Sequence, residues 1–218
     1  DEIIGGPGAA AAPPMRQPII VAVLPNDYPL FELFFVAAAT RSILLPVNTR
    51  LSPAEISRIL ESSDPSILVI GAQWRDLLET LELPERLKAV VWVGGVQNLP
   101  MDRRLYSLSY EAIVSAQPLH TGKPYQPVVV ADPASVHVGI FCPSGTTGRP
   151  KLVPHSHTNV FEHIRMTAEA LGLGREGECW GHFGPMYHVG DVAFVWCGVA
   201  IGARHVFHPN QLRFEDVA

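Results

Sequence analysis

The segment PSGTTGRPK, residues 143–151, gathers three hydroxyl side chains, two glycines and a lysine between two apolar runs. Glycines tolerate the close approach of a ligand, and an irregular glycine turn points backbone N–H groups at an anion. Ser144, Thr146 and Thr147 add hydroxyl donors, and Lys151 adds a mobile ammonium group. This combination predicts a phosphate-binding loop.

The loop differs from two familiar glycine motifs. Two residues separate Gly148 from Lys151, and Leu152 stands where a P-loop carries its magnesium-binding hydroxyl. A nucleophile elbow around Ser144 would need a glycine where Cys142 stands. The following KLVPH alternates like a strand and contains a proline that opposes a helix. We therefore expect a strand-loop-strand hairpin that holds phosphates without a helix dipole.

The rest of the sequence indicates an α/β domain around this hairpin. Short apolar runs at 19–24, 43–48, 66–70 and 89–93 predict strands, and segments 29–41, 51–63, 74–83 and 158–171 predict helices between and after them. Ser52, Pro53 and Glu55 form the start signal of the second helix. Strands that alternate with helices predict a flavodoxin-like, mostly parallel sheet with flanking helices. Residues 94–135 break this rhythm and are interpreted as an excursion from it.

Composition narrows the class of protein. The 218 residues are 47% hydrophobic with a net charge of −5, which suits a globular protein and argues against a nucleic-acid surface. Residues 1–18 begin with acidic side chains and contain four prolines, so we interpret them as a flexible lead-in and not as a signal peptide. The longest apolar run, 192–203, is too short to span a bilayer and predicts a buried helix.

Cysteine usage indicates the compartment. Cys142, Cys179 and Cys197 are an odd and widely spaced set without a C-x-x-C pair. Such a set fits a reducing compartment better than a disulfide framework. We expect a cytoplasmic protein, with a peroxisome or another organelle matrix as the alternative.

Three segments in one order resemble the AMP-forming adenylate enzymes, the superfamily of acyl-CoA synthetases, peptide-synthetase adenylation domains and beetle luciferases. PSGTTGRPK is similar to their phosphate loop, residues 21–70 to the opening of their N-terminal domain, and FGPMYHVGD, residues 183–191, to the motif that follows the loop. The resemblance covers roughly residues 19–208. It implies that residues 19–218 form part of an N-terminal, AMP-binding domain, truncated on its C-terminal side.

The resemblance also implies an activity. It implies an acyl- or aryl-acid:CoA ligase of the kind used in fatty acid metabolism, which activates a carboxylate as acyl-AMP, releases pyrophosphate and forms a thioester. Its substrates would be a small carboxylic acid, ATP and CoA, with Mg²⁺ as cofactor. Phosphate-binding residues would be Ser144, Gly145, Thr146, Thr147, Gly148 and Lys151, and the acyl pocket would be bordered by Tyr187 and His188.

Some features depart from the family pattern. Pro143 replaces the usual Thr or Ser before Ser144, which removes a hydroxyl and a backbone donor, and Leu152 replaces a common glycine. The family's magnesium-binding glutamate and C-terminal lysine lie downstream of this loop and are absent, so no catalytic residue is assigned and the chain alone is expected to be inactive. A non-catalytic nucleotide- or acyl-binding module of the same fold is the alternative.

Other histidines and the acceptor thiol are weighed separately. The pairs His155/His157 and His205/His208 lack supporting ligands at metal-site spacing, so no metal site is predicted. CoA is favoured over a carrier protein because GTTGRPKLVPHSH and PMYHVGD are more similar to acyl-CoA synthetases. The acid itself is not identified by these residues.

Overall fold

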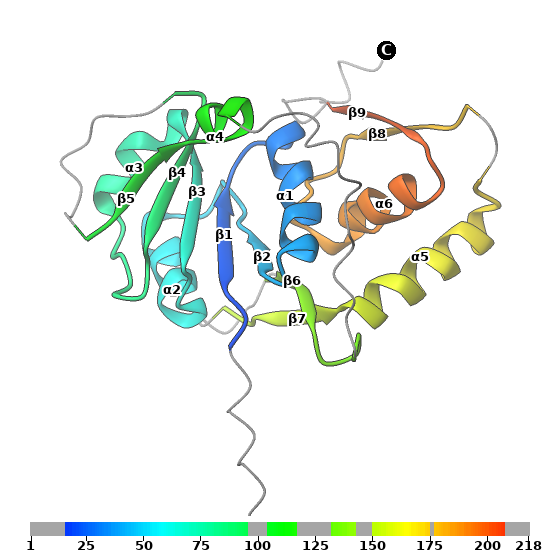
Figure 1. Ribbon diagram of the computed structural model, residues 1–218, viewed down its shortest axis with the longest axis horizontal. Coiled ribbons are helices and arrows are strands. Elements are labelled where there is room, and N and C mark those ends of the chain that lie inside the picture. The colour runs from blue at the N-terminus through cyan, green and yellow to red at the C-terminus, as the bar shows by residue number, and fades with distance from the viewer. Residues whose placement is uncertain (1–15, 96–103, 117–131, 143–149, 175–176, 208–218) are drawn as a thin grey trace, which may run out of the picture.

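The computed structural model describes residues 16–95, 104–116, 132–142, 150–174 and 177–207. The larger of its two sheets has seven strands in the order β5-β4-β3-β1-β2-β6-β7, with helices on both faces (Figure 1). Its strands are β1 (Ile19–Val23), β2 (Ile43–Pro46), β3 (Ile67–Gly71), β4 (Ala89–Val93), β5 (Tyr106–Ser109), β6 (His137–Phe141) and β7 (Val153–Ser156). The order of β2-β1-β3-β4-β5 is that of flavodoxin, so the predicted fold is confirmed.

The connecting helices are α1 (Tyr28–Ala39), α2 (Pro53–Ser63), a 3₁₀ turn (Ala72–Trp74) that leads into α3 (Arg75–Thr80), α4 (Tyr110–Ala116), α5 (His157–Leu171) and α6 (Val189–Ala200). The predicted helices are present, and α4 is an additional one. At α2, the Ser52 backbone N–H donates to the Glu55 carboxylate over 2.8 Å. At α1, the Asp27 carboxylate accepts from the Tyr28 N–H over 2.7 Å. Both bonds satisfy polar groups that a helix terminus leaves free.

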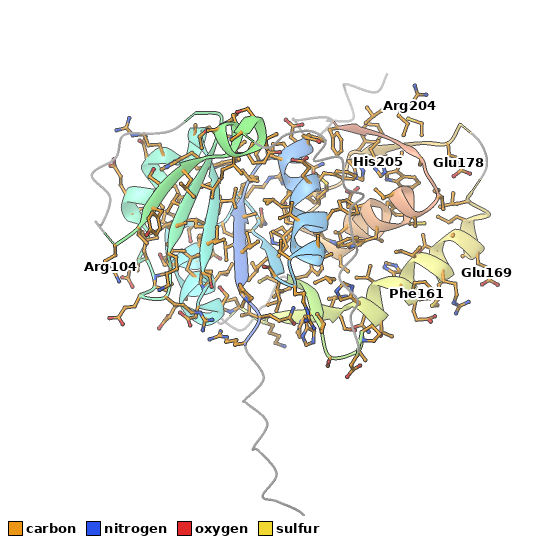
Figure 2. All side chains as sticks on the ribbon, in the orientation of Figure 1. Arg104, Phe161, Glu169, Glu178, Arg204 and His205 are labelled. Carbon is orange, nitrogen blue, oxygen red and sulfur yellow. The ribbon has the colours of Figure 1, made fainter. Side chains whose placement is uncertain are left out.

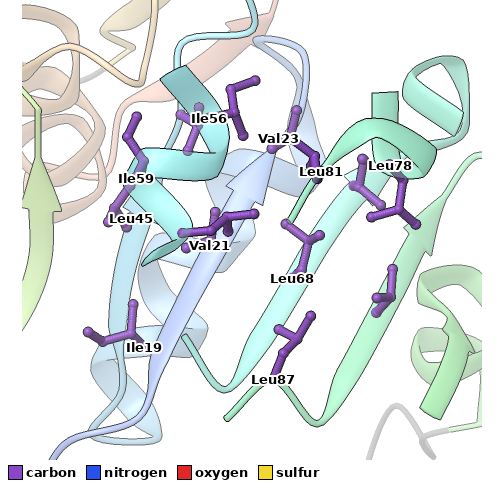
Figure 3. Packing of buried hydrophobic residues seen from close by; sticks show 14 of the residues in the cluster. Ile19, Val21, Val23, Leu45, Ile56, Ile59, Leu68, Leu78, Leu81 and Leu87 are labelled. Atoms are coloured by element: carbon purple, nitrogen blue, oxygen red, sulfur yellow. The ribbon is translucent and has the colours of Figure 1, made fainter. Parts of the chain in front are cut away.

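Each face of the sheet is covered by its own layer of helices. On one face, Val21 and Leu45 pack with Ile56 and Leu60 of α2 and with Leu78 of α3 (Figure 3). The opposite face is covered by α1 and α6, whose buried residues share a cluster with the alternate positions of β1 and β2: Ile20, Ala22, Leu30, Leu33, Phe34, Leu44, Val192 and Val195. Burial on both faces explains why these strands read as continuous apolar runs.

The segment 94–135, interpreted from the sequence as an excursion, contains a further βα unit. β5 pairs in parallel with β4, with Ala89 opposite Tyr106. The Trp92 indole N–H donates to the Ser107 hydroxyl over 3.1 Å, and the Tyr110 hydroxyl of α4 donates to the Glu32 carboxylate of α1. The interpretation was wrong because an exposed edge strand such as YSLS lacks the apolar run of a central strand.

β6 and β7 form the predicted hairpin. They pair antiparallel, with Phe141 opposite Val153 and a shift in register between His137 and Gly139. β7 leads directly into α5, where the Asn159 N–H donates to the Ser156 hydroxyl over 3.2 Å. The loop that joins the two strands, residues 143–149, lies outside the described residues.

The last part of the described chain makes a small second sheet. β8 (Cys179–His182) and β9 (Arg204–Phe207) pair in parallel, and α6 connects them. α6 is the helix predicted from the apolar run 192–203. In the portion of the chain that the structure describes, no helix has both the length and the apolarity needed to cross a membrane.

Core truncation should separate buried from exposed aromatic residues. Phe34 is fully buried and packs on Phe141 of β6 and Trp196 of α6, so Phe34→Ala is expected to lower the free energy of unfolding by about 3–5 kcal/mol. Phe161 of α5 is 64% exposed, and Phe161→Ala in this chain should cost less than about 0.5 kcal/mol. Urea unfolding of both variants tests this, and equal losses would contradict the described core.

Acid should weaken the hairpin region. Burial and repulsion from His163 lower the pKa of His155, whereas the unfolded chain titrates near its ordinary value of about 6.5. Between these two pKa values the unfolded chain binds more protons, so stability falls as pH drops below about 6.5. We expect the Tm decrease from pH 7.5 to 5.5 to be smaller in His155→Gln than in the unsubstituted chain. An equal decrease in both would contradict the prediction.

Candidate functional site

The carboxyl edge of the parallel strands is where the candidate site lies. β1, β2 and β6 run in the same direction, so Asn26 after β1 and Cys142 after β6 both follow carboxyl ends. In open α/β sheets, ligands bind outside this edge. Of the predicted site residues, Lys151, Tyr187 and His188 are described, whereas Ser144, Gly145, Thr146, Thr147 and Gly148 lie outside the described residues.

Both flanks of the glycine loop are fixed to the core. Cys142 and Leu152 pack against the same buried cluster, which lies under α2 and α3. Burial raises the pKa of the Cys142 thiol, which keeps it protonated and unreactive. Lys151, between the loop and Leu152, is exposed. Cys142 and Leu152 therefore anchor the two ends of the loop, and Lys151 is an exposed cationic side chain next to one of them.

A hollow of about 410 Å³ lies where the loop returns to the sheet. It is lined by Pro150 and by Arg58, Glu61 and Ser62 of α2. The Arg58 guanidinium also donates to the Ala54 carbonyl over 3.2 Å. Its lining includes neither Tyr187 nor His188, so this hollow and the predicted acyl pocket are separate features.

Residues 183–188 connect β8 to α6 and carry the two residues predicted for the acyl pocket. Met186 is fully buried in the cluster under α1, Tyr187 is half-buried and His188 is exposed. The His188 ring is the N-cap of α6, because its Nδ1 accepts from the Gly190 N–H over 3.2 Å. In the neutral ring the proton is therefore on Nε2, which leaves an N–H donor for a ligand.

Asn26 holds this connecting segment to the carboxyl end of β1. Its side-chain NH₂ donates to the carbonyl of His182 over 2.9 Å and to that of Gly184 over 2.8 Å. Its side-chain oxygen accepts from the Met186 N–H over 2.7 Å. One side chain thus satisfies three backbone groups between the end of β8 and Met186.

The side chains of Asp191, His182 and His205 form a row of polar contacts next to the same segment. His182 is fully buried, and its Nδ1 lies 3.0 Å from the carboxylate of Asp191, whose side chain is 9% exposed. On its other side, His182 Nε2 lies 2.8 Å from His205 Nδ1. A carboxylate only accepts hydrogen bonds, so His182 donates through Nδ1 and, in its neutral form, accepts at Nε2 from His205.

Packing explains how His205 reaches this position. Figure 2 shows His205 beside α6, where a Cβ on Gly198 would lie 2.6 Å from the imidazole Cε1. Phe31 of α1 packs on the rings of both histidines, with centroid distances of 5.8 Å to His182 and 4.7 Å to His205. Burial and the neighbouring His182 lower the pKa of His205, which favours a neutral ring, and donation to His182 places the proton of that ring on Nδ1.

Of the histidine pairs weighed in the sequence, His155, His157 and His205 are described. His205 is paired with His182, while His208 lies outside the described residues. Within the described ranges, no group of three or more His, Cys, Asp or Glu side chains could hold a metal ion.

Sequence reasoning missed Asn26, His182 and Asp191. A signal exists only for Asn26, which directly follows a buried strand in LPN, at the edge where ligands bind. The Asp191–His182–His205 contacts depend on how β8, α6 and β9 pack, and the spacing of these residues in the sequence does not encode that packing.

Solved structures share this fold. Over 93% of this chain and 46% of the other, the N-terminal domain of FACL13 from Mycobacterium tuberculosis superposes with a TM-score of 0.72 at 21% identity. A red-emitting luciferase from Phrixothrix hirtus superposes over 90% of this chain and 37% of the other, with a TM-score of 0.74 at 17% identity.

Curated relatives include CoA ligases. The chain is 29% identical to 4-hydroxybutyrate–CoA ligase 2 of Metallosphaera sedula over 83% of this chain and 32% of that protein. It is 25% identical to the peroxisomal trans-cinnamate:CoA ligase of Petunia hybrida over 92% and 37%, respectively. The chain therefore spans about a third of the length of these relatives.

A family model supplies the last comparison. The model described as AMP-binding enzyme matches residues 15–218, which is nearly the whole chain. This chain belongs to the AMP-binding enzyme family.

Proposed function

We propose that the protein carrying this chain is an ATP-dependent acid–CoA ligase that forms an acyl-AMP and then a thioester. Residues 19–218 would be part of its N-terminal, AMP-binding domain. The observation that carries the proposal is the anchored glycine loop with an exposed Lys151 at the carboxyl edge of a flavodoxin-like sheet. The CoA ligases among the relatives support the same reaction class.

The phosphates of ATP would be bound by the loop residues. Ser144, Thr146 and Thr147 supply hydroxyl donors, and Gly145 and Gly148 allow the backbone to approach. Lys151, which is exposed, would offset the negative charge that otherwise repels a carboxylate from the triphosphate. When the carboxylate oxygen bonds to the α-phosphorus, the bond from that phosphorus to the bridging oxygen breaks and pyrophosphate leaves.

The acyl group would lie beside Tyr187 and His188. Tyr187 supplies a half-buried aromatic ring, and the N-cap bond of His188 leaves its Nε2–H available as a donor. Both therefore position the substrate, and we assign neither a proton-transfer step. Mg²⁺ would supply further charge neutralisation when bound, but we assign it no ligand in the described part of the chain, where no suitable cluster exists.

A nucleotide-binding module without turnover is the second candidate. Pro143 favours it, because proline removes a backbone donor at the first position of the loop. This candidate predicts saturable ATP binding by the chain, with no acid-dependent exchange in the full-length protein.

We expect the protein in the cytoplasm or, as for the Petunia relative, in the peroxisome.

Exchange of labelled pyrophosphate into ATP tests the proposal in the full-length protein that carries this chain. With 4-hydroxybutyrate, trans-cinnamate and benzoate as test acids, we expect acid-dependent exchange. Lys151→Ala should slow it on the order of 10²-fold, because one preorganised charge on the phosphates is lost. The matched control is Lys88→Ala, an exposed lysine before β4, which should leave the rate unchanged. Equal rates for both variants would contradict the role of Lys151.

A further inference from the structure

The segment between β8 and α6 has an irregular backbone that is held in place by polar contacts to distant residues. Its residues 183–188 form neither helix nor strand, yet Met186 is fully buried and His182, at its start, has no exposed surface. Buried backbone polar groups must find partners. At this segment, three of the backbone groups bond to Asn26, a residue more than 150 positions earlier in the chain.

Asn26 is chemically suited to this place. An amide side chain carries two N–H donors and one acceptor on the same planar group. The two donors meet the carbonyls of His182 and Gly184, and the acceptor meets the Met186 N–H, all at 2.7 to 2.9 Å. The opposite amide orientation would place oxygen against two carbonyls and NH₂ against an N–H, so the contacts fix the orientation. An aspartate has the same shape but no donor when ionised.

The bond between His182 and Asp191 is a second attachment of this segment. The bond between His182 Nδ1 and Asp191 joins the end of β8 to the first turn of α6. It therefore connects the two ends of the segment that Asn26 also holds. His205 continues the chain from β9, and its own Nε2 is buried without a hydrogen-bond partner among the described residues. The rings of His182 and Phe207 stack at 5.1 Å, which limits rotation of His182.

These contacts converge on the two residues proposed for the acyl pocket. Tyr187 and His188 directly follow Met186, whose N–H donates to the side-chain oxygen of Asn26. On the other side, the His188 ring accepts a hydrogen bond from the Gly190 N–H. The positions of Tyr187 and His188 are therefore set from both sides. Nothing comparable joins Asn26 to Lys151 or to the loop flanks, which are anchored by apolar contacts.

We propose that Asn26 is a positioning residue for the acyl-binding side of the site, and that the Asp191–His182–His205 chain supports it. Asn26 acts through the backbone of residues 182–186 and sets the affinity for the carboxylic acid, while the phosphate loop sets the affinity for ATP. The acyl role rests on the proposed function, but the attachment of the segment by Asn26 does not.

Hydrogen exchange of the chain tests the attachment without any activity. Asn26→Ala removes three bonds, so the Met186 amide should exchange about tenfold faster or more at pH 7, while amides of β3 should stay unchanged. Asn26→Asp should be at least as fast, because an ionised carboxylate faces two carbonyl oxygens. Should Asn26→Ala fail to fold, Asn26→Ser retains a donor and an acceptor. An unchanged Met186 amide in Asn26→Ala or Asn26→Asp overturns the proposal, and in Asn26→Ser the amide should exchange at a rate between those of Asn26→Ala and the unsubstituted chain.

The pH profile distinguishes this role from loss of packing. In Asn26→Asp, protonation restores one donor to a carbonyl, so protection of Met186 should recover as pH falls from 7 to 5, relative to Asn26→Ala. Asp27, Asp191, His182, His188 and His205 lie around the position, and they are the same in both variants, so the ratio of rates reports the substituted carboxyl alone. Parallel profiles for the two variants would rule out the proposed hydrogen bonds.

Kinetics of the full-length protein test the acyl role. Asn26→Ala should raise KM for the carboxylic acid about tenfold or more, while KM for ATP stays within about twofold. Equal rises in both constants would show a general structural effect and overturn the assignment to the acyl side. If the unsubstituted protein shows no acid-dependent exchange, the proposed function fails, and the Met186 amide still decides whether Asn26 holds the segment.

Discussion

The position of β1 is the constraint on which the rest of the structure depends. It pairs in parallel with β2 on one side and β3 on the other, and all five of its residues are buried. A strand enclosed in this way cannot shift its register without exposing apolar side chains on both faces. The chain that leaves its carboxyl end at Leu24 therefore has a fixed starting point, and Asn26 lies two residues beyond it.

The two parts of the candidate site use that fixed edge in different ways. The flanks of the glycine loop are held by apolar packing of Cys142 and Leu152, which fixes the two ends of the loop. The β8–α6 segment is held by directional bonds to Asn26 and by the His182–Asp191 contact. Apolar packing tolerates rearrangement of a loop between its anchors, whereas three hydrogen bonds to one amide define a single backbone path.

Most of the fold could be predicted because its strands and helices have signals within their own short sequence segments. The central strands are continuous apolar runs because both faces of the sheet are covered. The start of α2 is predicted by Ser52, Pro53 and Glu55. β5 and α4 were missed because an edge strand is half exposed, and its place depends on tertiary bonds from Trp92 and Tyr110. Lys151, Tyr187 and His188 were predicted as site residues from their motifs. His182 was not, because its role depends on partners from α6 and β9.

The histidine chain shows why such partners matter to the site. Isolated in an apolar layer, the His182 ring would be costly to bury, since each ring nitrogen needs a hydrogen-bond partner. Asp191 supplies the acceptor and His205 supplies the donor, and Gly198 gives His205 the room to reach it. His182 also presents its backbone carbonyl to Asn26. The buried ring and the segment are thus one hydrogen-bonded unit, in which we expect a change at Asp191 or His205 to act on Tyr187 and His188 through the backbone.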